Sequence, residues 1–303
     1  MNKKVFQGIM PALVTPFDSE GKLKRKTVGE LINWQLSKGV QGFYICGNTG
    51  EGPVLPEQTR MEMAEAAVEA VNGRGVVIDH VMAADFHQTV RLAKHAEKAG
   101  ADAISSLTPT YFFGQNEDEI YEYYKALAGA VNIPLIAYVT PQMGAVRLPA
   151  LAERLLKIDN IIGFKFTRPS YFELFSLTQV HGGNINVLNG PDETLLCGLV
   201  MGADGGIGST YNLMAEGFVS LYENFRAGQW EAAQRDQYAI NRVIEVLLRH
   251  DALNCEKFVL RLLGFDVGES AFPRRRYAPE EQSAIRSELA EAGFFAQFAK
   301  DRQ

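Results

Sequence analysis

The sequence predicts an α/β protein whose strands close into a (β/α)8 barrel, the TIM barrel, with additional C-terminal helices. Three observations lead to this fold class. Eight short apolar segments occur within the first 210 residues, most are followed by a longer amphipathic segment, and no Ser/Gly/Pro-rich linker divides the chain. Strands that alternate with helices pair in parallel through right-handed crossovers, and eight such units close a barrel. An open doubly wound sheet is the alternative, but no G-x-G-x-x-G motif follows an early strand.

The eight expected strands are rich in β-branched or aromatic residues, or are bounded by Gly and Pro, as buried strands are. In chain order they are GIMPALVTPF (8–17), GFYICG (42–47), GVVIDHVM (75–82), AISSLTP (103–109), PLIAYVTP (134–141), IIGFKFT (161–167), INVLNG (185–190) and GADGGIGST (202–210). The last segment is dense in glycine and is the least typical strand of the set.

Helices are expected between these strands. The segment 56–73 has a proline near its first turn, ends at Gly73 and repeats apolar residues at spacings of three and four. The segment 86–100 ends at Gly100, and 118–131 opens with acidic residues that suit a helix N-terminus. We therefore expect a barrel over residues 1–225 and a helical extension over residues 226–303 that packs on it.

Composition excludes several function classes. The 303 residues are 47% hydrophobic and 22% charged, with a formal net charge of −6 and no long basic run, so nucleic acid is not an expected partner. The densest basic stretch, PRRRY at 273–277, is typical of a solvated or subunit-contact surface. The N-terminal apolar run is short and is broken by Pro11 and Pro16, which predicts neither a signal peptide nor a membrane span.

Cysteine and histidine patterns argue against a metal or disulfide framework. Cys46, Cys197 and Cys255 are far apart without a C-x-x-C motif, so we expect small buried side chains in a cytoplasmic protein. The five histidines show no metal-ligand pair, and neither a G-x-S-x-G motif nor a P-loop occurs. We therefore expect no metal, and a metal-dependent aldolase is disfavoured.

Lys165 is the unusual residue of the segment IIGFKFT, because a charged amine is rarely buried without a partner. Desolvation lowers the pKa of a lysine, and the neutral amine adds to a ketone to give an imine that draws electrons from the neighbouring carbon–carbon bond. The alternative is an amine that pairs with a core acid or extends to the strand end.

Two further segments support a carbonyl chemistry. Tyr138, on the neighbouring expected strand, could place a phenol beside Lys165 for proton transfer; the alternative is a core aromatic residue with a satisfied hydroxyl. The turn CGNTGEGP carries three glycines that free the backbone, so that amide N–H groups converge on an anion such as a carboxylate. Asn48 and Thr49 lie in this turn, although many tight turns have a similar composition.

With these residues assembled, the whole chain resembles the dihydrodipicolinate synthase/N-acetylneuraminate lyase family, through GIMPALVTPF, GNTGE, TPTYF, AYVTP, GFKFT and GADGGIGSTYN. The resemblance implies a pyruvate-dependent class I aldolase on a TIM barrel, usually a homotetramer, with no cofactor beyond the covalent imine at Lys165. It implies that Tyr138 transfers protons, that Thr49 holds the carboxylate of pyruvate, and that Tyr111 reaches a neighbouring subunit's site.

The same resemblance favours the N-acetylneuraminate lyase branch. NGPDE and GIGSTYN match the segments that hold the polyol chain of the sugar acid in that branch. The substrate-binding set that it implies is Asn48, Thr167, Gly190, Asp192, Glu193 and Ser209. Without the resemblance, an acidic helix N-terminus explains Asp192 and Glu193 equally well.

Several positions depart from the family pattern. The synthase branch commonly has an arginine where this chain has Met143, which argues against an aspartate-semialdehyde acceptor. Asn48, Val139, Pro191 and Leu253 also differ from the usual lyase residues. The expected reaction is reversible cleavage of N-acetylneuraminate to N-acetylmannosamine and pyruvate.

Alternatives to this reaction stay open. They are an aldolase or dehydratase for another 2-keto-3-deoxy sugar acid, a 4-hydroxy-tetrahydrodipicolinate synthase, and a catalytically silent sugar-acid-binding barrel.

Overall fold

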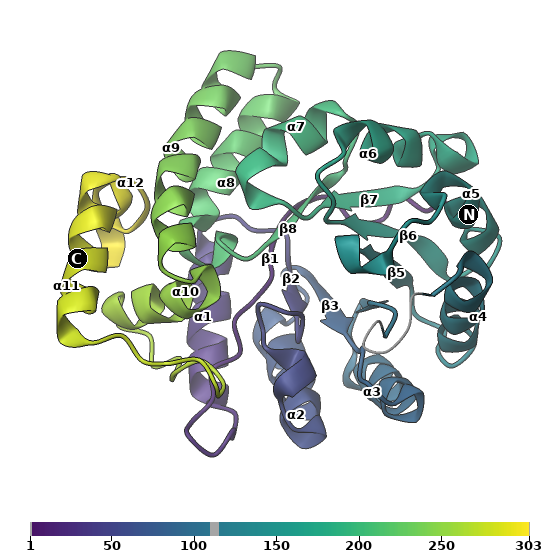
Figure 1. Cartoon of the computed structure of the whole chain (residues 1–303), viewed down its shortest axis with the longest axis horizontal. Coiled ribbons are helices and arrows are strands. Elements are labelled where there is room, and N and C mark those ends of the chain that lie inside the picture. The colour runs from purple at the N-terminus through teal and green to yellow at the C-terminus, as the bar shows by residue number, and fades with distance from the viewer. Residues whose placement is uncertain (1, 110–114, 303) are drawn as a thin grey trace.

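Eight parallel strands form the centre of the molecule in the computed structural model, which describes residues 2–109 and 115–302 (Figure 1). They are β1 (Gly8–Pro11), β2 (Gly42–Ile45), β3 (Val76–His80), β4 (Ala103–Ser106), β5 (Leu135–Val139), β6 (Ile161–Phe166), β7 (Asn186–Asn189) and β8 (Gly205–Gly208). Each strand pairs with the next in the chain from β2 to β8, and β8 pairs with β1. A parallel bridge between Ala12 and Tyr44 brings β1 against β2. The predicted TIM barrel is confirmed, and each strand lies inside its expected segment.

Helices surround the barrel and extend the chain beyond it. Those that follow the strands are α1 (Arg25–Ser37), α2 (Glu57–Val71), α3 (Phe86–Ala99), α4 (Glu117–Ala128), α5 (Leu148–Leu155), α6 (Tyr171–Thr178), α7 (Leu195–Val200) and α8 (Tyr211–Arg226). The C-terminal helices are α9 (Trp230–Arg249), α10 (Ala252–Leu262), α11 (Pro279–Glu291) and α12 (Phe294–Phe298). Figure 1 shows these four together on the side of the barrel where α8 and α1 lie, and α9, α10 and α12 all contact α8.

Local signals explain where the surrounding helices begin and end. Asp85 accepts hydrogen bonds from the backbone N–H groups of His87 and Gln88 at the start of α3, which ends at Gly100 in the left-handed conformation. A capping box between Asn116 and Glu119 opens α4. These caps satisfy backbone groups that a helix terminus otherwise leaves without partners.

Two apolar clusters hold the barrel together. The larger one lies between the strands and the helices, and Phe164 and Phe166 of β6 belong to it. The smaller one fills the barrel interior with one buried side chain from each of the eight strands, among them Met10, Tyr44 and Ile162. The interior is therefore packed and leaves room for chemistry only at the barrel ends.

An irregularity in the pairing of β5 with β6 sets which side chains of β6 face inward. Leu135 pairs with Ile161, whereas Ile136 pairs with Gly163, so Ile162 is an extra residue in β6. Since side chains alternate along a strand, an uninterrupted strand with Ile162 inside would turn Lys165 toward the helices. The extra residue reverses the alternation, so Phe164 and Phe166 pack outward and Lys165 faces the interior residue Tyr44.

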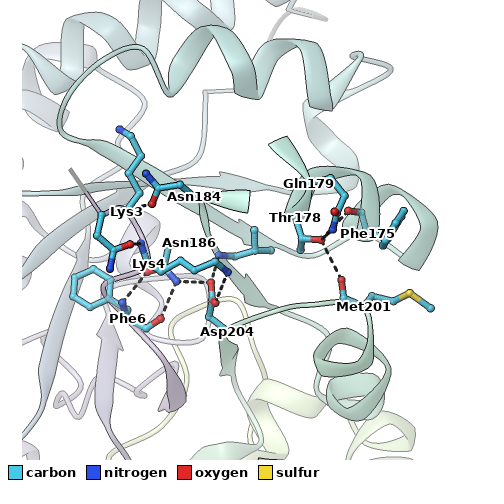
Figure 2. A network of polar contacts seen from close by, with 12 residues as sticks. Lys3, Lys4, Phe6, Phe175, Thr178, Gln179, Asn184, Asn186, Met201 and Asp204 are labelled. Carbon is cyan, nitrogen blue, oxygen red and sulfur yellow. Dashed lines mark hydrogen bonds and ion pairs between the residues drawn. The ribbon is translucent and has the colours of Figure 1, made fainter. Parts of the chain in front are cut away.

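The N-terminal segment closes the end of the barrel where the strands begin (Figure 2). The Asn186 side chain accepts a hydrogen bond from the Phe6 backbone N–H and donates one to the Phe6 carbonyl. Lys3 donates through Nζ to the Ile161 carbonyl at 2.6 Å. Asp204 pairs with Lys4 and accepts from Asn186. Polar contacts thus fix the chain start across several strands.

The cysteine expectation holds only in part. Cys46 and Cys255 are buried, but Cys197 on α7 is exposed, so the expectation was wrong for Cys197. The short helix α7 presents this position to solvent, and helix periodicity alone did not indicate that face.

In the described part of the chain, no helix is both long and apolar enough to cross a bilayer.

Candidate active site

Lys165 lies inside the barrel on β6, between two aromatic rings. Its side-chain nitrogen is 4.1 Å from the centre of the Tyr44 ring and 4.4 Å from that of Tyr138. Burial lowers the pKa of Lys165 to about 7, and the negative charge of Asp192 partly opposes this shift. Among the described residues, no carboxylate lies within ion-pair distance of the amine. A substantial fraction of Lys165 is therefore neutral and nucleophilic near pH 7.

Tyr138 is the residue of β5 that pairs in register with Lys165. Burial raises the pKa of Tyr138, the Thr167 hydroxyl lowers it, and the charge of Asp192 raises it. The phenol therefore stays protonated at neutral pH and can exchange a proton with a group bound at Lys165. The register brings together the two residues that the sequence placed on neighbouring strands.

Tyr44 and His80 complete an aromatic group around the amine, and sequence reasoning missed both. The Tyr44 hydroxyl donates to Ser105 Oγ at 3.1 Å. His80 accepts at Nε2 from the Leu107 backbone N–H, which leaves the proton on Nδ1 for the Cys46 carbonyl at 3.2 Å. Burial, followed by nearby positive charges, lowers the pKa of His80 to about 3, so this imidazole is neutral. The sequence feature that could have indicated both residues is the one that indicated Lys165, a polar side chain within an apolar strand.

Asp192 is a buried carboxylate at the C-terminal ends of β7 and β8. Its Oδ2 accepts from the Thr210 backbone N–H at 2.7 Å, from Thr210 Oγ1 at 2.8 Å and from Ser209 Oγ at 3.4 Å. Burial raises the pKa of Asp192 to about 6, while the two hydrogen bonds from Thr210 lower it. A Cβ at Gly208 would lie 2.0 Å from Asp192 Oδ1, so only glycine allows this approach. Thr210, which organises the carboxylate, was expected at the end of the eighth strand but without a role in the site.

Thr167 and Gly190 lie against one another at the ends of β6 and β7. The Gly190 backbone N–H donates to the Phe166 carbonyl at 2.8 Å. A Cβ added at Gly190 would lie 1.8 Å from Thr167 Oγ1. That hydroxyl is buried, has no partner among the described residues, and is near enough to lower the pKa of Tyr138. The absence of a side chain at Gly190 therefore lets the Thr167 hydroxyl lie beside Tyr138.

Two of the cavities formed by the described residues contain the expected substrate-binding residues. The first, of about 470 Å³, is lined by Thr167, Arg168, Gly190, Asp192, Glu193, Ser209 and Thr210, together with residues of α9 and Ala252 of α10. The second, of about 270 Å³, is lined by Asn48, Glu51, Leu253 and residues 271–274. Lys165 and Tyr138 do not line either cavity in the described part of the chain, because both are buried inside the barrel. The first two residues of α10 line different cavities, Ala252 the first and Leu253 the second.

The turn after β2 is held by a buried ion pair that sequence reasoning missed. Glu51 has a left-handed backbone with φ of 55°. Its Oε1 is 2.7 Å from Lys257 Nζ, and its Oε2 accepts from the Ala271 backbone N–H at 2.7 Å. The GNTGE motif had indicated the turn but not this partner.

The other residues expected in the site have no described contact with Lys165. Asn48 is exposed, Thr49 is half-buried, and the described part of the structure gives no side-chain contact between Thr49 and Lys165. Glu193 is exposed at the cavity. Tyr111 lies outside the described residues. Five of the six expected substrate-binding residues line the first cavity, and Asn48 lines the second.

The chemistry available here is that of an amine, a phenol and a polar cavity. Within residues 2–109 and 115–302, no cluster of three His, Cys, Asp or Glu side chains could hold a metal ion. The positively charged group of Arg168 at the cavity is bound to Glu173 at 2.9 Å and to the Gly144 carbonyl at 2.8 Å. The arrangement thus suits imine formation beside a pocket rich in carboxylates and hydroxyls.

Comparisons with known proteins give consistent likenesses over nearly the whole chain. The family model described as the dihydrodipicolinate synthetase family matches residues 5–292. N-acetylneuraminate lyase of Rhizobium meliloti (strain 1021) is 35% identical over 285 residues, which is 94% of each chain. Ruminococcus gnavus sialic acid aldolase superposes with a TM-score of 0.91 at 29% identity, covering 98% of this chain and 99% of that one. Dihydrodipicolinate synthase from Aquifex aeolicus superposes with a TM-score of 0.88 at 27% identity, covering 95% and 99%.

Proposed function

The chain belongs to the dihydrodipicolinate synthetase family of lyases, and on this premise we propose that it cleaves N-acetylneuraminate reversibly to N-acetylmannosamine and pyruvate. The observation that carries the proposal is the buried Lys165 amine, whose pKa is lowered to about 7 and whose register partner is Tyr138. Such an amine attacks a ketone at neutral pH without further activation.

Bond cleavage follows from the imine. The Lys165 nitrogen adds to the C2 ketone of the open-chain sugar acid, and loss of water gives a protonated imine. Tyr138 donates its phenol proton to the hydroxyl that leaves as water and becomes a phenolate. The phenolate then removes the proton of the C4 hydroxyl, the C3–C4 bond breaks, and its electron pair moves into the imine as an enamine. The aldehyde product leaves, the enamine takes up a proton at C3, and hydrolysis releases pyruvate and the free amine.

Binding of the substrate is divided between the two ends of the site. Asn48 and Thr49 hold the carboxylate in the turn after β2, chiefly through backbone N–H groups. Asp192, Glu193 and Ser209, with Thr167 and the Gly190 backbone, contact the hydroxyl groups of the sugar chain. The carboxylates and hydroxyls that line the first cavity support this assignment, since each accepts or donates a hydrogen bond to a sugar hydroxyl.

The likeness to a dihydrodipicolinate synthase makes that reaction the second candidate. Met143, where that branch commonly carries an arginine, is buried in the apolar core and offers no charge for an acceptor carboxylate. The sialic acid substrate is therefore preferred.

Self-association as a homotetramer, with Tyr111 completing a neighbouring site, is part of the same proposal, and light scattering after size-exclusion chromatography tests it.

Pyruvate release from N-acetylneuraminate, coupled to lactate dehydrogenase, tests the substrate. We expect release by the native chain and none by Lys165→Ala. Tyr138→Phe should still form the borohydride-trapped pyruvate adduct but lose about 100-fold or more in kcat. Trapping without release would retain the imine chemistry and reject N-acetylneuraminate. A panel of other 2-keto-3-deoxy acids would then identify the substrate.

A further inference from the structure

Glu256 is a buried carboxyl group that the proposed reaction does not use. It lies on α10 with no solvent exposure. Neither carboxyl oxygen has a hydrogen-bond partner among the described residues. Its neighbour Lys257 does not neutralise it, because that amine pairs with Glu51 and donates to the Glu269 carbonyl at 3.0 Å. A buried carboxylate with no partner is costly, so a specific role is needed to explain it.

The position of Glu256 connects it to the first cavity. Ala252, one helical turn earlier on the same face of α10, lines that cavity. The groups that act on Glu256 are Asp192, whose negative charge raises its pKa, and Ser209, whose hydroxyl lowers it. Both belong to the cavity wall. Glu256 thus lies directly behind the edge that we assign to substrate hydroxyls.

The charges around Glu256 favour its neutral form. Burial and then Asp192 raise the pKa of Glu256 to about 8, whereas the pKa of Asp192 is about 6. Asp192 therefore ionises first, and its charge helps to keep Glu256 protonated at pH 7. Glu256 also acts on Cys255, a buried thiol whose pKa is raised to about 12 and which stays neutral.

The hydrogen-bond directions leave one place for the Glu256 proton. Ser209 donates its only hydroxyl hydrogen to Asp192 Oδ2, which also accepts from Thr210. The Ser209 oxygen therefore keeps free lone pairs, and a protonated carboxyl beside it can donate to them. A hydrogen bond from the protonated Glu256 to the Ser209 oxygen, which the present side-chain positions do not form, would give this carboxyl the partner that it lacks.

We propose that Glu256, as a protonated acid, is a positioning residue that donates a hydrogen bond to Ser209 and so fixes the hydroxyl-binding edge of the cavity formed by Ser209 and Asp192. This inference rests on the proposed function, because it assigns that edge to a polyhydroxylated substrate chain. An ordered serine and carboxylate select for a hydroxyl at one position of the substrate, since binding then costs less side-chain entropy. Ionisation of Glu256 removes the donor and places a second negative charge at the same edge.

Two substitutions separate positioning from a structural role. Glu256→Gln keeps the shape of the side chain and an N–H donor but cannot ionise. Glu256→Leu removes the donor and leaves no buried polar group at this position. We expect Glu256→Leu to raise the KM for N-acetylneuraminate about tenfold with little change in kcat, the effect of losing one hydrogen bond. The same variant should unfold at a temperature close to or above that of the native chain, because a buried polar group is replaced by an apolar side chain of similar size. Glu256→Gln should keep the native KM at pH 7 and hold it at pH 9, where the native KM rises.

A spectroscopic measurement decides the protonation state without any substrate. The infrared difference spectrum between the native chain and Glu256→Gln should contain the C=O stretch of a protonated carboxyl at pH 7, and this band should weaken at pH 9. Absence of the band at pH 7 overturns the inference. An unchanged KM in a folded Glu256→Leu overturns the positioning role as well. If the native chain traps pyruvate but releases none from N-acetylneuraminate, the proposed substrate fails, while the infrared result still decides the state of Glu256.

Discussion

At the scale of single residues, the surroundings of Lys165 have opposite effects on the protonation of its amine. Two ring faces within 4.4 Å favour the charged amine, by about 0.5–2 kcal/mol per contact. Burial inside the barrel favours the neutral amine, and several kcal/mol of lost hydration outweigh the ring contacts. Burial lowers the pKa of Lys165 from 10.5 to about 7, and the charge of Asp192 partly opposes this shift. The rings therefore orient the amine more than they hold its proton.

The pH dependence of imine formation follows from this pKa. Because only the neutral amine attacks a ketone, the rate of borohydride trapping with pyruvate should rise as pH increases through about 7. Asp192 raises the pKa of Lys165, so Asp192→Asn should move the midpoint to a lower pH. The trapped adduct, measured by mass spectrometry across pH 5–9, gives both midpoints, with Lys165→Ala as the blank. A midpoint near 10 in the native chain would contradict the desolvated amine.

The sequence indicated some of the residues around the amine and missed others. Lys165 and Tyr138 stood out because a lysine in an apolar strand and a tyrosine on its neighbour suggest a reaction. Tyr44 and His80 did not, because an aromatic or histidine in a buried strand is usually part of a core. Glu256 lay on a helix with no motif around it, and only its burial without partners distinguishes it.

At the scale of elements, the extra residue in β6 determines which way the lysine points. The pairing skips from Ile161 to Gly163 against two consecutive residues of β5. Gly163 tolerates this local geometry because a Cβ there would lie 1.8 Å from the Asn186 carbonyl of β7. Alternation along the sequence could not reveal this skip, since one inserted residue reverses every later side chain.

The contact between α10 and the turn after β2 is the second feature at the scale of elements, and it positions that turn. Lys257 has no exposed side-chain surface and joins Glu51, while its amine lies 3.6 Å from the centre of the Phe17 ring. Loss of one partner leaves a buried charge without compensation. The pair therefore holds the turn that carries Asn48 and Thr49 against the C-terminal helices.

Substitution of Lys257 tests that role. Lys257→Met keeps a similar length and should lower the free energy of unfolding by about 3–5 kcal/mol, because Glu51 remains buried without its positive partner. The double variant with Glu51→Gln should recover much of this loss, and urea unfolding measures both. Equal stability of the native chain and Lys257→Met would show that the ion pair does not hold the turn.

At the scale of the whole molecule, the two ends of the barrel have different tasks. The candidate site occupies the C-terminal end of the strands, as in other barrels of this kind. The opposite end is closed by the N-terminal segment and the polar network of Figure 2. Asp204 is central there, since its Oδ2 accepts from the Val187 N–H and from Asn186 Nδ2, both at 2.9 Å. The residues of the candidate site thus lie at one end of the barrel, and the polar network that stabilises the fold lies at the other.

This separation predicts a stability change without a catalytic one. Asp204→Ala leaves a buried N–H and a side-chain amide without their acceptor, and should cost about 1–3 kcal/mol of unfolding free energy. Lys4→Ala removes only the partly exposed partner of Asp204 and should cost less than about 1 kcal/mol. Urea unfolding gives both values. Pyruvate release per folded molecule should be unchanged in both variants, and a fall in kcat for Asp204→Ala would contradict the separation.

The sequence by itself determined the alternation of strands and helices, and with it the barrel and the end at which polar side chains converge. Those features follow from local composition, glycine and proline positions and caps, which act over a few residues. It also identified Lys165 and Tyr138 as neighbours, because consecutive strands pair. Only the tertiary structure decided that the extra residue in β6 turns the lysine inward, that Glu51 meets Lys257, and that Glu256 lies behind Ser209. These contacts join segments far apart in the chain, and packing selects them through burial and hydrogen-bond satisfaction that no local pattern encodes.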